Sequence, residues 1–426
     1  MRSADLIVSN CHQLLTCEGP LPKRKEALQD VGLRKQVWIA SHRGKIVFIG
    51  SQQEFEKGVK VEQNAEIIDG RKLVALPGFV DSHTHLPFAG TREEEFLLRL
   101  KGYSYQQLAE KGLGIQTTVK ATRKASREEL VFLCLERLDS MLRMGTTMVE
   151  AKSGYGLNLQ DEIKQLQAIK EANQIHPVDV VATFMGAHEV PPEYKRHKNG
   201  YIELLIHEIM PEVRKRNLAE FFDVFCEESV YSVAESRKLI RAAKKESFKI
   251  RIHADEFSAL GGAELAVEEG AFSADHLLAV TETGIKKLAA SKTAATLLPA
   301  VPFFLRQKKQ APARQLIDEG AIVALATDFN PGSSMTESML FVLQLAVFTM
   351  KMSVEEALNA ATANASYALG RDKEVGSLEV GKKMDLILAE IPNYAFLFYH
   401  LGVNPIKYVI KNGKVVVKEG KIVRPS

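Results

Sequence analysis

Two histidines separated by one residue, His83 and His85, are the first feature of this sequence that could carry chemistry. They close residues 75–85, an apolar stretch that we predict to be a buried strand. Side chains two residues apart on a strand point to the same face, roughly 6.5 to 7 Å apart. Both imidazoles could therefore bind one divalent metal, with each nitrogen about 2.0 to 2.1 Å from the ion. A lone histidine pair is more often an ordinary core or surface feature, so the hypothesis needs further ligands.

Two further residues, His253 and Asp328, complete a candidate ligand set. Three imidazoles and one carboxylate suit Zn²⁺ and also Fe²⁺. Each residue has an ordinary alternative, since a histidine can bond a neighbour and an aspartate before Phe-Asn-Pro-Gly can cap a turn. Four such residues at the ends of strands 1, 5 and 8 of one fold are hard to explain by chance. We therefore expect a divalent metal, either zinc or iron.

Eight apolar, strand-like segments alternate with helical segments and must position these residues. After residues 75–80, the segments are 146–151, 178–184, 222–226, 249–253, 271–276, 294–299 and 322–328, with helices such as 126–143 and 159–173 between them. This alternation predicts an α/β fold with a parallel (β/α)8 TIM-like barrel, in which active sites lie at the C-terminal ends of the strands. The polar candidates fall at those ends: His83, His85, Glu150, His188, Cys226, His253, His276 and Asp328.

Both ends of the chain have strand composition and the middle does not. Strand-like segments recur before residue 75 and again at 376–388 and 408–417, where Asn412-Gly413 predicts a hairpin. We interpret residues 1–75 plus 375–426 as one small composite β-sandwich domain, with the barrel in residues 76–374. Two unrelated β extensions are the alternative.

Composition narrows the class of protein. The chain has 426 residues, 46% hydrophobic and 26% charged, and a net charge of +3, so nothing indicates nucleic-acid binding. Four cysteines without a Cys-x-x-Cys spacing fit a reducing cytoplasm. The longest apolar stretch, residues 339–350, is too short for the roughly 20 residues that span a bilayer, so we predict a buried helix and no membrane association.

Several motifs resemble known families. Residues 77–85 (Pro-Gly-Phe-Val-Asp-Ser-His-Thr-His) and 376–386 resemble the first-strand signature and the return to the β domain of the amidohydrolase superfamily. Longer blocks at residues 150–157, 184–188, 253–256, 274–276 and 326–333 resemble the imidazolonepropionase family. The resemblance implies hydrolysis of 4-imidazolone-5-propanoate to N-formimidoyl-L-glutamate in histidine degradation, using a metal-activated water. It also implies a homodimer.

Opening a cyclic amide needs an activated water, an acid–base group and a site for developing oxyanion charge. Glu256 lies three residues after His253, and we assign it the proton transfer; a surface carboxylate is the alternative. His276 could stabilise the oxyanion or share the proton transfer, or act as a fifth metal ligand as in related deaminases. Asp328 counts as both ligand and catalytic residue.

The substrate carries a propionate, so the pocket needs cations and hydrogen-bond donors. Arg92 matches the family's substrate arginine, although a loop arginine is usually just solvated. Further substrate-binding positions carried over from the family are Tyr105, Tyr155, His188, Glu256, Asn330, Gly332 and Ser333.

The chain departs from the family pattern at Leu113, within Gly112-Leu113-Gly114, and at Ala300, both usual glycine positions. These changes bear on pocket loops and leave the metal set intact. Strand 4 ends Phe-Cys-Glu-Glu, without the bridging carboxylated lysine of two-metal relatives, and Lys152 follows strand 2 instead. We therefore expect one metal. The alternatives are another mononuclear amidohydrolase or deaminase, such as formimidoylglutamate deiminase, and a non-catalytic barrel used in assembly.

Overall fold

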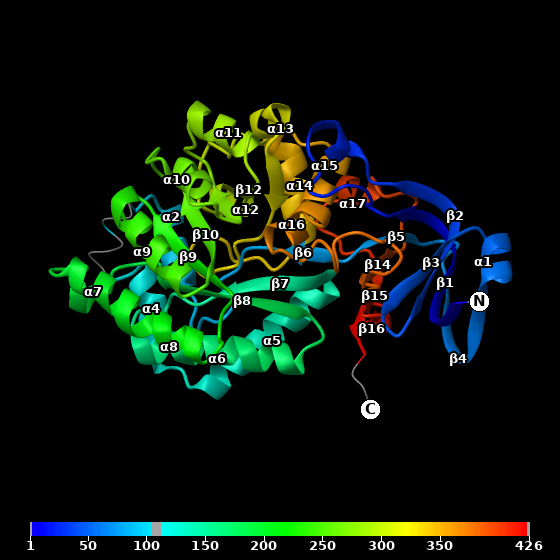
Figure 1. Ribbon diagram of the computed structural model, residues 1–426, viewed down its shortest axis with the longest axis horizontal. Coiled ribbons are helices and arrows are strands. Elements are labelled where there is room, and N and C mark those ends of the chain that lie inside the picture. The colour runs from blue at the N-terminus through cyan, green and yellow to red at the C-terminus, as the bar shows by residue number, and fades with distance from the viewer. Residues whose placement is uncertain (1, 104–106, 108–111, 424–426) are drawn as a thin grey trace.

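Two β-sheets organise the structure, a computed structural model that describes residues 2–103, 107 and 112–423 (Figure 1). One is an eight-stranded sheet of parallel pairs, and the other is a nine-stranded mixed sheet built from both ends of the chain. The eight strands follow one another around the sheet in sequence order, from β6 to β13. The predicted (β/α)8 barrel is confirmed.

The barrel strands occur where the alternation predicts them. Their bounds are β6 (Phe79–Asp81), β7 (Thr146–Lys152), β8 (Asp179–Ala187), β9 (Phe221–Cys226), β10 (Lys249–Ala254), β11 (Ser273–His276), β12 (Ala294–Leu297) and β13 (Ile322–Leu325). All seven residues of β7 are buried, as expected for a parallel strand covered on both faces.

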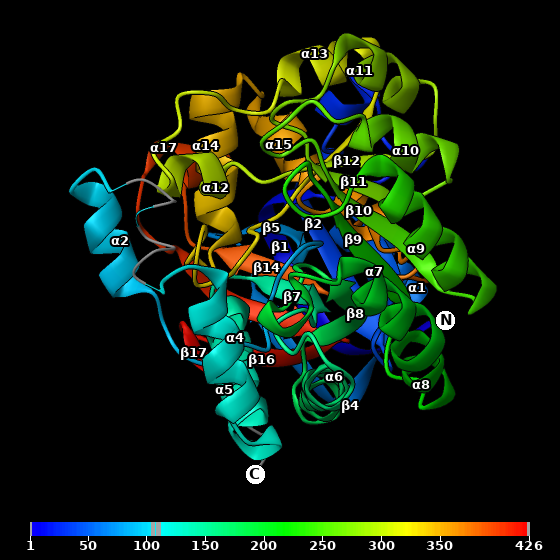
Figure 2. The ribbon, with the colours of Figure 1, turned by 90° about the vertical axis from the view of Figure 1, so that its left-hand side faces the viewer.

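Helices surround the barrel strands (Figure 2). Their bounds are α2 (Glu93–Leu100), α4 (Ile115–Lys124), α5 (Arg127–Arg143), α6 (Leu159–Ile175), α7 (Lys198–Leu204), α8 (Met210–Lys215), α9 (Val233–Lys245), α10 (Gly262–Glu268), α11 (Glu282–Ala289), α12 (Ala300–Phe304), α13 (Ala313–Glu319), α14 (Met339–Met350), α15 (Val354–Ala360) and α16 (Ala363–Ala368). Ser126 caps α5 by accepting the amide of Glu129, and Asn158 caps α6 by accepting that of Asp161. The apolar segment 339–350 is indeed a largely buried helix, α14.

The nine-stranded sheet joins the two ends of the chain. Its strands are β1 (Arg2–Leu15), β2 (Leu33–His42), β3 (Lys45–Gly50), β4 (Val59–Asp69), β5 (Val74–Pro77), β14 (Leu386–Ala389), β15 (Ile406–Lys411), β16 (Lys414–Lys418) and β17 (Lys421–Ile422). Helix α1 (Gln52–Gly58) packs beside β1 to β4, and α17 (Phe396–Tyr399) packs on α14. N-terminal β5 pairs with C-terminal β14. The predicted Asn412-Gly413 hairpin joins β15 to β16, with both residues at positive φ, 49° and 68°.

The prediction of one strand over residues 75–85 is wrong, because the stretch is divided between the two sheets. Its first part, β5, pairs with β1 and β14, whereas β6 pairs with β7 in the barrel. Gly78 lies between them, and a Cβ there would collide with the Thr147 side chain. A glycine is needed where the chain passes so close to β7 on its way from one sheet to the other.

Hydrogen bonds beyond the ends of β6 and β13 close the barrel at its mouth. The Asp328 amide donates to the His83 carbonyl, and the His85 amide donates to the Phe329 carbonyl, both at 3.0 Å. Below them, buried Asp81 accepts the Thr327 amide at 3.0 Å and its hydroxyl at 2.6 Å. The candidate ligands His83, His85 and Asp328 therefore also contribute the backbone groups that close the barrel.

Replacing Asp81 with alanine should lower the free energy of unfolding by about 1–3 kcal/mol, because the buried Thr327 amide loses its acceptor. Urea unfolding followed by circular dichroism would measure this. Asp318→Ala, at an exposed site on α13, is the control and should stay within about 0.5 kcal/mol of the parent. Equal stability of the two variants would show that the hydrogen bonds from Thr327 to Asp81 do not stabilise the closed barrel.

Among the described residues, no helix combines the length and the apolar composition that a bilayer crossing requires.

Candidate active site

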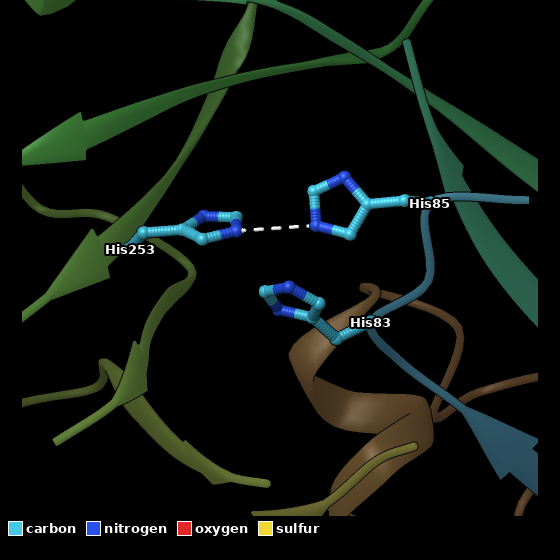
Figure 3. A group of neighbouring side chains, drawn as sticks. All are labelled: His83, His85 and His253. Atoms are coloured by element: carbon cyan, nitrogen blue, oxygen red, sulfur yellow. Dashed lines mark hydrogen bonds between the residues drawn. The ribbon is translucent and has the colours of Figure 1, made fainter. Parts of the chain in front are cut away.

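Three histidine rings face one another at the mouth of the barrel (Figure 3). His83 and His85 follow β6, and His253 lies in β10. The Nε2 atoms of His85 and His253 are 3.4 Å apart. Asp328, after β13, brings its Oδ1 to 3.3 Å from the Nε2 atoms of both His83 and His85. The structure thus brings together the four residues proposed from the sequence as metal ligands.

Orphaned polar atoms indicate what this cluster is built to hold. Nε2 of His83 and Oδ1 of Asp328 are buried and have no hydrogen-bond partner in the described structure. A buried polar atom without a partner is costly, and a divalent cation among these atoms would remove that cost. His83, His85 and His253 offer donor atoms within 4.8 Å of one another, as do His83, His276 and Asp328. The donor set therefore fits a metal ion.

Buried carboxylates orient two of the rings. His83 donates its Nδ1 hydrogen to Asp275 at 2.7 Å, and His253 donates its own to Asp223 at 3.1 Å. Each bond leaves Nε2 as the free nitrogen that faces the cluster, which is the usual role of a partner behind a metal-binding histidine. Arg251 supports Asp275 at 3.1 Å.

Left-handed backbone occurs at several strand ends of the site. The φ angles of Asp255, His276 and Asp328 are 50°, 76° and 51°. Such conformations are unfavourable for residues with a Cβ and are typically kept where a functional geometry requires them. Here His276 ends β11, and Asp255 and Asp328 follow β10 and β13, at the mouth of the barrel.

Glu256 and His276 face each other beside the cluster, with 3.6 Å between Oε1 and Nδ1. Burial, together with the charges of Asp328 and Glu227, raises the pKa of the Glu256 carboxyl well above its usual value. Burial also lowers the pKa of His276 well below its usual value, and His253 and His83 add to that effect. A carboxyl whose protonated form is favoured and an imidazole whose neutral form is favoured are thus adjacent.

Glu227 holds the loop that carries Glu256. Its carboxylate accepts the amides of Phe257 at 3.0 Å and Ser258 at 3.3 Å, as well as the Ser258 hydroxyl. Glu227 is buried and lies just past β9. The carboxyl group of Glu256 is therefore attached to a constrained turn.

Two aromatic side chains that the sequence analysis expects to bind substrate, His188 and Tyr155, lie beside the histidine cluster. His188 stacks on His85, with ring centroids 4.9 Å apart, and donates Nδ1 to the Gly154 carbonyl at 3.0 Å. Tyr155 is buried, with its ring 5.3 Å from that of His188, and burial raises the pKa of its hydroxyl. The two rings form an apolar wall with polar edges.

Arg92 lies at the start of α2 and is almost buried, with its side chain 11% exposed. Glu95 accepts two hydrogen bonds from it, at 2.8 Å from Nε and 2.6 Å from an Nη atom. The other Nη atom lies against Gly332, where an added Cβ would collide with it. A cavity of about 290 Å³ adjoins this arginine, lined by Thr91, Arg92, Glu93, Phe96, Phe304, Pro331 and Met335.

Asn330 organises its own turn. Its amide donates to the Asp328 carbonyl at 2.7 Å and the Ser333 hydroxyl at 2.8 Å, while its oxygen accepts the amides of Gly332 and Ser333 at 2.8 Å. The turn begins directly after Asp328. Its geometry therefore links the candidate metal ligand to the loop beside Arg92.

Four other positions noted in the sequence have different outcomes. Tyr105 lies outside the described residues, and Leu113 is half-buried shortly before α4. Ala300 begins α12 and is 2% exposed. Lys152 ends β7 and forms ion pairs with Glu150 and Asp223.

A model of the family described as "Amidohydrolase family" matches residues 74–416. The chain belongs to the amidohydrolase family. Curated imidazolonepropionases match it over nearly their whole length: that of Alkaliphilus metalliredigens is 45% identical over 98% of this chain and 99% of its own. The Geobacillus kaustophilus protein is 48% identical, with the same coverage of both chains. The resemblance to the imidazolonepropionase family is therefore confirmed.

Solved structures of other proteins share this amidohydrolase's fold. A triazine hydrolase variant matches 99% of this chain and 96% of its own, with a TM-score of 0.78 and 16% identity. Atrazine chlorohydrolase from Arthrobacter aurescens, complexed with zinc, matches 99% of this chain and 97% of its own, with a TM-score of 0.75 and 16% identity. At this identity the likeness concerns the fold alone. Together with the buried histidine cluster, family membership indicates a metal site.

Sequence reasoning missed most of the residues that support the site of this amidohydrolase. Asp223 and Arg251 stand between apolar neighbours in β9 and β10, and a charge within a buried strand is the signal that could have revealed them. Glu95 and Glu227 carried no comparable signal, because each adjoins another glutamate and lies outside the buried strands.

Proposed function

We propose that this chain is an imidazolonepropionase, which hydrolyses 4-imidazolone-5-propanoate to N-formimidoyl-L-glutamate in histidine degradation. The observation that carries the proposal is the match of 45% to 48% identity to curated imidazolonepropionases over 98% of the chain. The geometry supports it, since a buried His-rich cluster, a carboxyl–imidazole pair and an arginine lie near the mouth of one barrel.

One divalent metal, zinc or iron, is proposed to be held by His83, His85, His253 and Asp328. When bound, the metal would lower the pKa of water to about 7 in favourable sites and would polarise a carbonyl. His276 lies close enough to act as a further ligand, and its pairing with Glu256 favours the alternative role of stabilising the oxyanion.

Glu256 is the group that moves protons. It takes a proton from the attacking water as the C–O bond forms, and it delivers a proton to the ring nitrogen as the C–N bond breaks. Burial favours its neutral form after it accepts the first proton, which is what the second transfer needs. His276 donates to the carbonyl oxygen while negative charge develops there.

The propionate is recognised by Arg92, with Glu95 orienting the guanidinium from the other side. Tyr155, His188 and the turn of Asn330, Gly332 and Ser333 complete the proposed pocket, together with Tyr105. Glu95 takes up the bidentate face of the guanidinium, so the Nη atom beside Gly332 is the group available to the substrate.

Gly332→Ala should raise KM by about tenfold or more while changing kcat little, because the new Cβ displaces the Arg92 Nη atom that faces the propionate. Loss of one charge-assisted hydrogen bond is worth about 1.5–3 kcal/mol, and about 1.4 kcal/mol corresponds to tenfold. Gly58→Ala is the control, since a Cβ at Gly58 meets nothing within 4 Å. Steady-state kinetics would measure both, and an unchanged KM for Gly332→Ala would remove Arg92 from the propionate site.

A substrate panel tests the proposed activity. Purified protein is given freshly generated 4-imidazolone-5-propanoate, followed by its ultraviolet decay, and separately N-formimidoyl-L-glutamate. Conversion of the first into the second supports the proposal. Deimination of formimidoylglutamate, without turnover of the imidazolone, would instead identify a deiminase of the same family.

A cytoplasmic location and a homodimer are also proposed. The spacing of the cysteines, all four of which are buried and free, supports the first. Family resemblance supports the second, and light scattering on the purified protein would test it.

A further inference from the structure

Lys152 is a fully buried lysine that connects, through two carboxylates, to His83 and His85 on one side and to His253 on the other. Lys152 ends β7, and its side chain has no exposed surface. Its ammonium lies 2.7 Å from Glu150 Oε1 and 2.8 Å from Asp223 Oδ2, neither of which is exposed. Burying a cation is expensive unless it is paired, so two carboxylates at hydrogen-bond distance indicate a specific structural task.

The ion pair with Glu150 connects Lys152 to His83 and His85, which follow β6. The second oxygen of Glu150 accepts the Thr84 amide at 3.1 Å, and the Glu150 carbonyl accepts the Thr84 hydroxyl at 2.6 Å. The amide of Lys152 itself donates to the Thr84 carbonyl at 3.0 Å. Thr84 lies between His83 and His85, so these bonds hold the backbone from which both rings project.

The ion pair with Asp223 connects Lys152 to His253 in β10. Oδ1 of Asp223 accepts both the backbone amide of His253 at 3.2 Å and its ring Nδ1 at 3.1 Å. The carboxylate therefore fixes the position of His253 and the nitrogen that it presents. Its other oxygen, Oδ2, forms the ion pair with the lysine ammonium at 2.8 Å.

The strands that position these histidines, β6 and β10, do not pair with each other. Between β6 and β10 the sheet order places β7, β8 and β9, so no backbone ladder sets the spacing of their histidines directly. The ammonium reaches from β7 past β8 to Asp223 on β9. We propose that Lys152 is a positioning residue that sets the spacing between His83, His85 and His253 for the metal. The inference rests on the proposed metal site.

Lys152→Met tests this, because methionine keeps much of the side-chain volume and removes the ammonium. Arg251 Nε, 3.9 Å from the same Glu150 oxygen, leaves that carboxylate a cationic neighbour in the variant. Zinc affinity is measured by competition with a chromophoric chelator, and ligand geometry by the visible spectrum of the Co²⁺-loaded protein. We expect zinc binding to weaken about 10- to 100-fold, the usual effect of losing an outer partner of a metal site.

Lys411→Met is the matched control. Lys411 is also buried and also bridges two carboxylates, Asp179 at 2.8 Å and Asp385 at 2.6 Å, but it belongs to the mixed sheet. Weaker zinc binding and an altered Co²⁺ spectrum in Lys152→Met alone support the proposal. Unchanged zinc affinity in Lys152→Met overturns it, as does an equal loss in both variants, which would reflect general destabilisation.

Two isosteric variants keep the test decisive if Lys152→Met does not fold. Glu150→Gln weakens the ion pair that connects Lys152 to His83 and His85, and Asp223→Asn weakens the ion pair that connects it to His253. Each variant should reduce zinc affinity. Parent-like affinity in both overturns the inference while leaving the proposed function standing. Failure of the parent protein itself to bind zinc or iron would overturn the proposed metal site and the inference together.

Discussion

Replacing Glu256 with glutamine should reduce kcat by about 10²- to 10⁴-fold, the range that a positioned acid–base group contributes. Glutamine has the same shape but cannot accept the proton of the attacking water. Metal content should stay near that of the parent, because Glu256 is not among the proposed ligands. Steady-state kinetics with metal analysis of the same sample would measure both.

Glu228→Gln is the control for this experiment, since Glu228 follows the same strand end as Glu227 but is exposed. Its kcat should match that of the parent. A Glu256→Gln enzyme that keeps more than about a tenth of the parent kcat would exclude Glu256 as the proton-transfer group, given the expected range.

The pH profile gives a separate test of Glu256. Only the ionised carboxylate can accept a proton, and the pKa of this carboxyl is raised above its ordinary value of 4.5 by burial and by neighbouring negative charge. As the pH falls through the raised pKa, the base form is lost, so kcat/KM should fall on the acidic side at a pH above 4.5. The acidic limb should disappear in Glu256→Gln; an identical limb in that variant would assign it to another group.

Asp328→Asn should abolish nearly all turnover and strip the protein of its metal. The Oδ1 atom of Asp328 is a buried anionic oxygen that lies 3.3 Å from the Nε2 atoms of both His83 and His85. An amide oxygen is a neutral and weaker ligand, so we expect metal affinity to fall by more than the 10- to 100-fold typical of an outer-partner loss. Chelator treatment of the parent protein should have the same effect on activity, with recovery on adding metal back.

Asp385→Asn is the matched control, because Asp385 is equally buried and pairs with Lys411 in the mixed sheet. It should lose stability yet keep its metal. Stoichiometric metal measured by mass spectrometry in Asp328→Asn would remove Asp328 from the ligand set. Chelator-resistant turnover by the parent would contradict metal-assisted hydrolysis altogether.

Much of the fold follows from local pattern. Strand–helix alternation placed all eight barrel strands, because parallel strands buried on both faces produce short, continuous apolar runs. Turn chemistry likewise predicted the Asn412-Gly413 hairpin. The stretch 75–85 was misjudged because its apolar composition is continuous, whereas Gly78 divides it between two sheets for a steric reason that only the neighbouring Thr147 reveals.

The sequence by itself determined the chemistry that is available: the identity of the candidate ligands, their location at strand ends and the presence of Glu256 beside them. Side-chain alternation and strand order are local properties, so they can be inferred without knowing what lies across the barrel. Only the tertiary structure decided which groups support them. Asp275 reaches His83 from 192 residues away, and Lys152 meets Asp223 across an intervening strand. Such contacts depend on barrel closure, which brings distant strand ends within hydrogen-bond distance, and no spacing along the chain encodes them.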